Sequence, residues 1–230
     1  MSAPLVIAID GPSGVGKSTL ARGLAAHLDI PYLDTGAMYR AVGVAATAAG
    51  LDLEDEAHVV AVAAAMQFDF APGPPAGRLR VNGHELGDEI RDEAAGYAAS
   101  LVSRHRAVRE VLVEQQRRLV AARGGVMEGR DIGTVVLPDA PVKVFLTADL
   151  ATRARRRQRQ LSGRGAAGNL ESITAAIAER DERDATRAHA PLIAAPDAIH
   201  LNSAGLSAAE VLARVVELVV QRTGRGGGGG

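Results

Sequence analysis

The chain has 230 residues, 47% of them hydrophobic and 23% charged, which fits one globular domain of common size. Its formal net charge of −1 excludes a global field that would attract nucleic acid or an anionic membrane, so a polyanion site has to come from local clustering. The chain has no cysteine, which excludes disulfides, thiolate metal sites and thiol nucleophiles. The amino-terminal segment lacks the features of a signal peptide, and no apolar run is long enough to span a membrane, so we expect a cytoplasmic protein.

Short aliphatic strands alternate with helices along the chain. In chain order, the pattern predicts strands at residues 5–9, 30–33, 126–128, 142–146 and 198–201. It predicts helices at residues 18–28, 37–49, 59–65, 150–161, 170–187 and 207–222, and a long helical segment from 93 to 123 that breaks near His105. Such alternation implies a parallel sheet with helices on both faces, so we expect a three-layer α/β fold.

Between residues 67 and 90 the sequence changes to short alternating segments and turn residues, which predicts a small antiparallel insert. Residues 68–70 and 78–81 alternate between apolar and polar side chains, as half-buried strands do. A turn-rich stretch lies between them at 72–77, and Asn82-Gly83 is a strong hairpin signal.

The clearest motif follows the first predicted strand. The phosphate-loop pattern G-x-x-x-x-G-K-[ST] is matched without a departure by Gly11, Pro12, Ser13, Gly14, Val15, Gly16, Lys17 and Ser18. The glycines allow several backbone N–H groups to face one anion, and the helix that follows adds the positive end of its dipole. Lys17 would reach the β- and γ-phosphates of a nucleoside triphosphate, and the Ser18 hydroxyl would be a ligand for Mg²⁺. A chance match is the alternative, but the flanking strand and helix favour a functional loop, and Lys17 is one of only two lysines in the chain.

A phosphate loop predicts a nucleoside triphosphate but not a reaction. A switch GTPase would carry an N-K-x-D motif that reads the base, and the chain has none, since its other lysine, Lys143, follows Val142. A kinase instead needs a second anion site that faces the loop and holds the acceptor. We favour a kinase with a small acceptor, and a P-loop regulatory or nucleic-acid-binding ATPase is the alternative from another class.

Three groups of arginines are candidates for this second anion site. Arg40 lies one turn inside a predicted helix, and residues 130–131 (Arg-Asp) follow a strand end, where α/β sheets bind ligands. A third group shares one face of the helix at 170–187 and consists of Arg180, Asp184 and Arg187. Taken singly, each group also fits a structural role, as a surface arginine, an ion pair in a turn or a solvated, salt-bridged helix.

Together these motifs resemble those of the bacterial cytidylate kinases, which belong to the P-loop nucleoside monophosphate kinases. The resemblance covers nearly the whole chain and is carried by GPSGVGKST, YLDTGAMYR, the insert, EGRDIGTVV, PDAPVKVFL and ERDERDATR. It implies a nucleoside monophosphate kinase core with a small antiparallel β insert and a short helical lid. It also implies one catalytic domain at 1–223, with a monophosphate-binding insert at about 67–100 and a lid at about 150–170, and a disordered glycine-rich tail at 224–230.

The resemblance implies roles for individual residues. Catalytic roles would fall to Lys17, Arg130, Arg180 and Arg187. Besides the loop at 11–18, ATP would be bound by Thr19 and Arg157. The acceptor would be bound by Thr35, Arg40, Ser100, Arg109, Arg130, Asp131, Arg180, Asp184 and Arg187, of which Ser100, Arg109 and Asp131 would read the cytosine ring. Glu128 is either a water-mediated Mg²⁺ contact or structural, and we favour the structural role.

The expected reaction is transfer of the γ-phosphoryl group of ATP to CMP or dCMP, with Mg²⁺ and without a protein nucleophile. Another acceptor (UMP, dTMP or AMP) is the nearest alternative. The arginine-rich helix at 150–161 would be part of a lid, and the alternative of a nucleic-acid-binding helix is disfavoured by the net charge and the lack of nearby aromatics. We expect a monomer that binds neither nucleic acid nor membranes.

Overall fold

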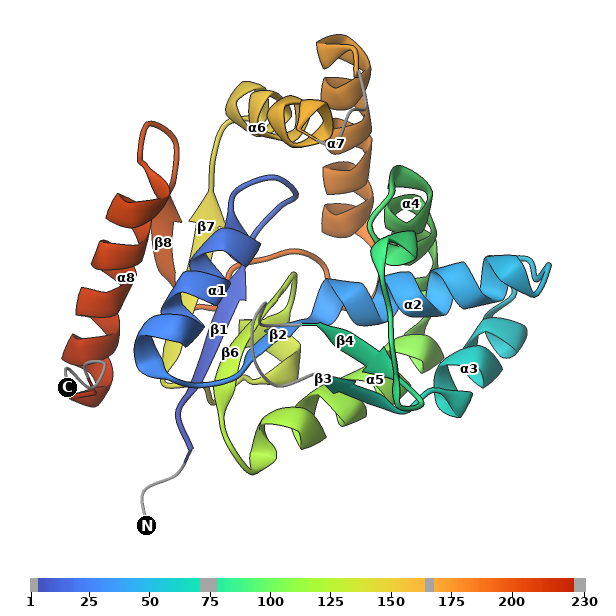
Figure 1. Cartoon of the computed structure of the whole chain (residues 1–230), viewed down its shortest axis with the longest axis horizontal. Coiled ribbons are helices and arrows are strands. Elements are labelled where there is room, and N and C mark those ends of the chain that lie inside the picture. Colours follow the sequence, from blue (N-terminus) through green and yellow to red (C-terminus); the bar gives the residue numbers. More distant parts are fainter. Residues whose placement is uncertain (1–3, 71–77, 164–167, 226–230) are drawn as a thin grey trace.

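The computed structural model describes residues 4–70, 78–163 and 168–225, and within them a five-stranded parallel sheet forms the centre (Figure 1). In sheet order the strands are β2 (Tyr32–Asp34), β6 (Gly125–Gly129), β1 (Val6–Asp10), β7 (Val142–Thr147) and β8 (Ile199–Asn202). Every pairing is parallel, so the carboxyl ends of all five strands meet at one edge of the sheet. The five predicted strands are confirmed, each shifted by one or two residues.

Helices cover both faces of this sheet, which confirms the predicted three-layer α/β fold. On one face, α1 (Lys17–Leu28) and α8 (Ala208–Thr223) pack against Ile7 and Ile9 of β1. On the other face, α5 (Arg106–Ala121) and a five-residue π-helix, η2 (Ile132–Val136), pack against Ala8. Alternate residues of β1 therefore face opposite layers, as expected for a strand buried on both sides. The π-helix has no counterpart among the predicted elements.

A second core joins the predicted insert to the rest of the chain. Its helices are α2 (Thr35–Ala48), α3 (Glu56–Ala65) and α4 (Glu93–Val102), and α4 is separated from α5 at the predicted break near His105. The insert is a three-stranded antiparallel sheet formed by β3 (Phe68–Phe70), β4 (Leu79–Val81) and β5 (His84–Glu85), followed by a 3₁₀ turn, η1 (Asp88–Ile90). Asn82 and Gly83 both have positive φ, which confirms the predicted hairpin turn. The predicted turn-rich stretch at 72–77 lies outside the described residues.

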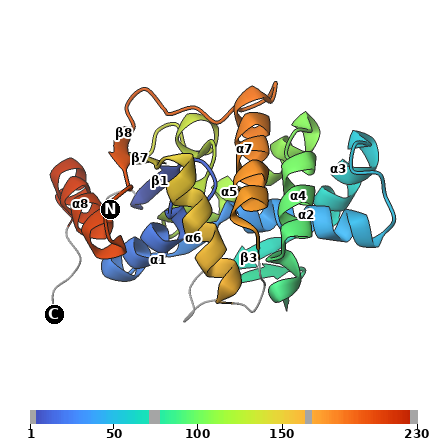
Figure 2. The ribbon, with the colours of Figure 1, turned by 90° about the horizontal axis from the view of Figure 1, so that it is seen from above.

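Two helices stand above the carboxyl edge of the sheet (Figure 1). They are α6 (Leu150–Ser162) and α7 (Leu170–Thr186), and they share a small apolar contact that includes Ala154, Ile173 and Ile177. Figure 2 shows α7 between α6 and α4, so α7 links the predicted lid to the second core. Among the described helices, none is both long and apolar enough to cross a membrane.

The contact between α2 and α4 requires a glycine at one position. A Cβ added to Gly43 would lie 2.7 Å from the Cβ of Ala98 and 3.0 Å from its carbonyl carbon. We predict that Gly43→Ala lowers the free energy of unfolding by about 1–3 kcal/mol, although alanine is the better helix former. The measurement is urea unfolding followed by circular dichroism.

Gly96→Ala on α4 is the matched control, because its added Cβ would meet only Nη1 of Arg180 at 3.5 Å. This variant should be as stable as the parent or more stable by up to about 1 kcal/mol. Equal stabilities of the two variants would contradict the close helix contact.

Candidate active site

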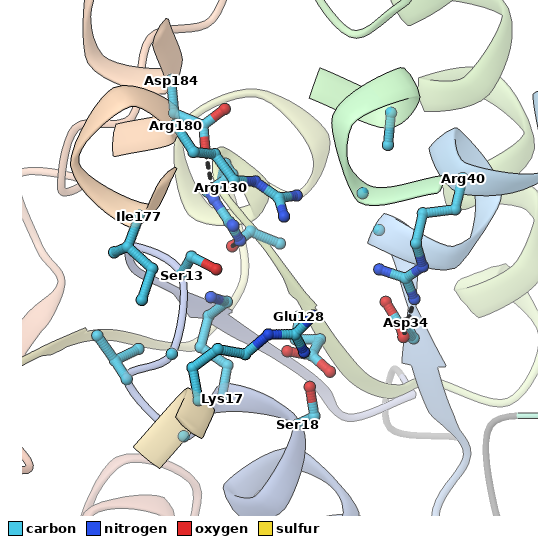
Figure 3. A pocket seen from close by; sticks show the side chains of 18 of the residues that line it. Ser13, Lys17, Ser18, Asp34, Arg40, Glu128, Arg130, Ile177, Arg180 and Asp184 are labelled. Carbon is cyan, nitrogen blue, oxygen red and sulfur yellow. Dashed lines mark hydrogen bonds and ion pairs between the residues drawn. The ribbon is translucent and has the colours of Figure 1, made fainter. Parts of the chain in front are cut away.

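A cleft of about 1110 Å³ is lined by residues from the carboxyl edge of the sheet, from helices α6 and α7, and from helices α2 and α4. All of the predicted site residues line it except Gly11 and Pro12, which form the base of the phosphate loop. Figure 3 shows side chains from opposite walls turned toward one space: Lys17 and Ser18 from the loop side, Arg130, Arg180 and Asp184 above them, and Arg40 with Asp34 across from them.

The phosphate loop is tightly folded between β1 and α1. Gly11 has a φ of 146°, and a Cβ there would collide with the carbonyl oxygen of Leu146 on β7. Gly16 has a φ of 100° and forms the amino-terminal cap of α1, so the first N–H groups of that helix border the cleft. The Nζ atom of Lys17 donates to the carbonyl oxygens of Gly11 and Pro12 at 2.8 Å each, which holds the ammonium group across the loop.

Positive charge accumulates at the centre of the cleft. Burial, together with the charge of Arg130, lowers the pKa of Lys17 to about 7. Burial, again with Arg130 as the main neighbour, lowers the pKa of Arg180 to about 10. Both shifts follow mainly from burial and then from neighbouring cations, so an anion bound here would stabilise the charged form of each.

Carboxylates hold several of the arginines by only part of their guanidinium groups. Arg40 donates from Nη2 to Asp34 at 2.8 Å, and Arg130 donates from Nε to Asp184 at 2.8 Å. Burial opposes ionisation of both carboxyls, but the arginine partners hold the pKa values of Asp34 and Asp184 below their usual range. Among the described residues, three buried guanidinium nitrogens in the cleft have no hydrogen-bond partner: Arg40 Nε, Arg180 Nε and Arg187 Nη2. These N–H groups are directed donors for a ligand.

A deeper polar pocket surrounds Asp131. Its carboxylate accepts from Nη2 of Arg109 and lies 3.7 Å from Nη2 of Arg187. The guanidinium of Arg109 also lies over the ring of Tyr39, 5.5 Å from its centre. These residues come from η2's amino-terminal turn, α5, α2 and the end of α7, so segments far apart in sequence form one pocket.

Ser100 borders the same pocket, and its partner, Arg183, was not among the predicted site residues. Its hydroxyl oxygen accepts from Nε of Arg183 at 3.2 Å, and the Arg183 guanidinium covers the ring of Tyr97 at 5.0 Å. Arg183 lies three positions after Arg180 on α7, so helical spacing was the signal that could have placed it at the site.

Glu128 is buried at the end of β6, yet its carboxylate borders the cleft beside Ser18 (Figure 3). Tyr32 donates its hydroxyl to Glu128 Oε1, and burial, followed by the charge of Asp34, raises the pKa of the Glu128 carboxyl. Thr35 donates to the backbone carbonyl of Glu128 at 2.7 Å. The carboxylate is thus both buried and at the border of the cleft, and the two roles considered for Glu128, structural and water-mediated contact with Mg²⁺, remain predictions.

The arginines of α6 divide into two sets. Arg153 and Arg156 donate to backbone carbonyls of the phosphate loop, at Ser13 (3.2 Å) and Val15 (3.1 Å) respectively. Arg157 lines the cleft and lies 3.9 Å from Glu93 on α4, across the mouth of the site. Arg156 belongs to both sets, because it also lines the cleft, as Arg159 does.

This fold and site define a P-loop phosphotransferase, in which a phosphate loop faces a second cluster of arginines across one cleft. The sequence model of the cytidylate kinase family matches residues 7–221. The chain is 45% identical to the cytidylate kinase of Geobacillus kaustophilus, over 97% of this chain and 100% of that protein. It is 46% identical to that of Mycobacterium avium, over 97% and 98% of the two chains, and 43% identical to that of Geobacter sulfurreducens, over 95% and 94%. The chain belongs to the cytidylate kinase family.

The lowered pKa of Lys17 predicts proton uptake when ATP binds. At about pH 8, most Lys17 side chains of the free protein are neutral, and the phosphates of ATP raise the pKa so that each bound complex takes up as much as one proton. Calorimetry in buffers of different ionisation enthalpy measures this uptake.

Lys17→Arg is the control, because a guanidinium stays protonated and its binding of ATP should take up no proton. Equal proton uptake by the variant and the parent would place the titrating group elsewhere.

Proposed function

We propose that this protein transfers the γ-phosphoryl group of ATP to CMP or dCMP, giving ADP and CDP or dCDP. Membership of the cytidylate kinase family supports the reaction. The observation that carries it at the site is a set of three guanidinium N–H groups without a hydrogen bond among the described residues, on Arg40, Arg180 and Arg187, in the same cleft as the phosphate loop. A site that bound ATP alone would not need this second group of donors.

The donor nucleotide would occupy the phosphate loop. Backbone N–H groups of the loop and of the first turn of α1 would hold the β-phosphate, and Lys17 would contact the β- and γ-phosphates. Thr19 and Arg157 would complete this side, with Arg157 above the triphosphate. Lys17 would have to exchange its contacts with the carbonyls of Gly11 and Pro12 for contacts with phosphate.

The acceptor phosphate would lie opposite, held by Arg40, Arg130 and Arg180. Two unit charges about 4 Å apart repel by about 4 kcal/mol at an effective dielectric of about 20, so the two substrates need this positive charge between and around them. Arg40 and Arg130 contact Asp34 and Asp184 through one part of the guanidinium group and keep donors for a phosphate. Among the described residues, Arg180 has no hydrogen bond to a carboxylate. The acceptor oxygen would attack the γ-phosphorus directly, so no protein nucleophile is required.

Base selection would take place around Asp131. Its carboxylate would accept from the exocyclic amino group of cytosine, and Arg109 would donate to the ring acceptors, with Ser100 at the edge. Uracil carries a carbonyl oxygen in place of this amino group. That oxygen would face the Asp131 carboxylate, and both buried acceptors would lack a donor. Asp184 and Arg187 would contact the ribose and the region between base and phosphate.

The residues beside the loop fit a Mg²⁺ ion bound with the triphosphate. Among the described residues, no group of three or more histidines and carboxylates could hold a metal by itself. Ser18 and Glu128 nevertheless present a hydroxyl and a buried carboxylate to the same space, the oxygen donors that Mg²⁺ takes together with phosphates and water. Bound there, Mg²⁺ would neutralise charge on the β- and γ-phosphates.

The remaining predictions stay proposals. Residues 1–223 would form one catalytic domain that acts as a monomer in the cytoplasm, with no nucleic acid or membrane partner. The lid predicted at about 150–170 would close over both substrates and exclude water, which would otherwise accept the phosphoryl group; its residues 164–167 lie outside the described residues. Of the glycine-rich tail predicted at 224–230, residues 226–230 also lie outside them.

The acceptor is tested by coupled ADP release with CMP, dCMP, UMP, dTMP and AMP. CMP and dCMP should support turnover far above the rate of ATP hydrolysis without acceptor. Turnover with UMP alone would overturn the acceptor, and hydrolysis that no acceptor stimulates would overturn the kinase itself.

We predict that Asp131→Asn reduces the ratio of kcat/KM for CMP to that for UMP by about a hundredfold or more, because the amide no longer offers two acceptor oxygens. The ratio is measured in the same assay. Asp139→Asn is the control, since Asp139 is an exposed aspartate eight positions further along and should leave the ratio unchanged. An unchanged ratio in Asp131→Asn would remove Asp131 from base selection.

We predict that Glu128→Gln raises the Mg²⁺ concentration for half-maximal turnover by about tenfold or more, since the amide holds a Mg²⁺ ion or its water less well than a carboxylate. Tyr32→Phe is the control, because it removes the hydroxyl that bonds the same carboxylate and keeps the charge. A Mg²⁺ dependence that is identical in Glu128→Gln and the parent would favour the structural role.

A further inference from the structure

Asp10 is the last residue of β1 and directly precedes the phosphate loop. Its side chain is buried, and its carboxylate bonds to the turn that follows β6. Oδ1 accepts from the backbone N–H of Ile132 at 2.8 Å, and Oδ2 accepts from that of Gly133 at 2.7 Å. One carboxylate therefore satisfies two consecutive backbone donors from a segment more than 120 residues away.

These two donors open the π-helix η2. Within η2, the N–H groups of Val135 and Val136 both donate to the carbonyl oxygen of Asp131, so the hydrogen bonds of the helix begin after Gly133. The turn is also pressed onto the sheet, because a Cβ added to Gly133 would lie 3.3 Å from Asp10 Oδ2 and 3.2 Å from Cδ of Lys143. The position of residues 130–133 thus depends on Asp10.

Holding this turn with a buried carboxylate lowers the stability of the fold at neutral pH. Burial raises the pKa of Asp10 to about 6, with Asp131 adding to the rise, although both backbone N–H groups and Lys17 act in the opposite direction. A carboxyl whose pKa is higher in the folded state than in the unfolded state makes folding less favourable as pH rises between the two values. At neutral pH the charged form is therefore retained at a cost, which is common for residues that serve a site rather than the fold.

We propose that Asp10 is a positioning residue for the acceptor site: it fixes the turn that carries Arg130 and Asp131 relative to the phosphate loop. Arg130 and Asp131 immediately precede the two residues that Asp10 holds, and Asp10 itself precedes Gly11. One side chain thus sets the distance between the donor loop and the groups that contact the acceptor. This inference rests on the acceptor roles proposed above for Arg130 and Asp131.

The competing explanation is that Asp10 acts on the donor through Lys17. The charge of Asp10 favours the protonated form of Lys17, but it contributes less to the pKa of Lys17 than burial, Arg130, Glu128 or Arg180. A role through Lys17 would appear in the KM for ATP, and a role through the turn would appear in the KM for CMP and in base selection.

The test is Asp10→Asn, which keeps the size of the side chain but replaces one acceptor oxygen with a donor that faces an N–H group. The KM for CMP should rise about tenfold or more and the kcat/KM ratio of CMP to UMP should fall, while the KM for ATP stays within about twofold. Reversible partial unfolding would raise both KM values by the same factor, so they are measured at a temperature at which each variant is fully folded. The exposed Asp139→Asn variant is the control and should match the parent in all three quantities.

A second variant moves the turn without removing the charge. Gly133→Ala adds a Cβ against Asp10 and Lys143, and it should produce the same rise in the KM for CMP with little change in the KM for ATP. The proposal is overturned if Asp10→Asn raises the KM for ATP as much as that for CMP, or if it lowers the melting temperature and leaves both KM values unchanged. If the parent protein uses an acceptor other than CMP, the proposed substrate is wrong, and the same comparison is made with that acceptor.

Discussion

Repulsion between two polyanionic substrates is the constraint from which the arrangement of this cleft follows. Binding ATP and a nucleoside monophosphate within bonding distance requires buried cations in excess of the carboxylates that could neutralise them. Burial and the neighbouring cations already lower the pKa values of Lys17 and Arg180. Burial of like charges is unfavourable, and the ligands are the groups that relieve it.

The acidic residues of the site orient the arginines without neutralising all of their positive charge. Asp34 and Asp184 each contact one edge of an arginine, which fixes the plane of the guanidinium and leaves its other donors free. Breaking such a buried pair from the acidic side would release a flexible cation, so the carboxylates supply orientation more than attraction. The same principle applies to the backbone, where Asp10 holds a turn and leaves the side chains on that turn available.

The parts of the site that could be predicted from the sequence are those whose geometry is local. The phosphate loop is contiguous, and Arg180, Asp184 and Arg187 share a helix face by simple periodicity, so both patterns were visible before any fold was known. Arg40 and Arg130 could be placed because parallel strands end at a common edge. The contacts of Asp10, the Arg183–Ser100 hydrogen bond and the Glu128 carboxylate beside Ser18 join segments that are distant in sequence. Sequence periodicity does not predict such contacts, and it does not predict the different partners of Arg156 and Arg157 either.

The scarcity of lysine has a consequence for handling the protein. Lys143 is buried on β7 and bonded to both carboxylate oxygens of Asp197, so it is shielded in the fold. Lys17 is the other lysine, and its lowered pKa makes its amine largely neutral, and so nucleophilic, in mildly alkaline buffer. Lys17 is buried as deeply as Lys143, but it lines the cleft, so we expect only amine-directed reagents small enough to enter the cleft to reach it. Labelling of Lys17 by such a reagent would report on the phosphate loop, and a nucleotide bound there would protect the amine.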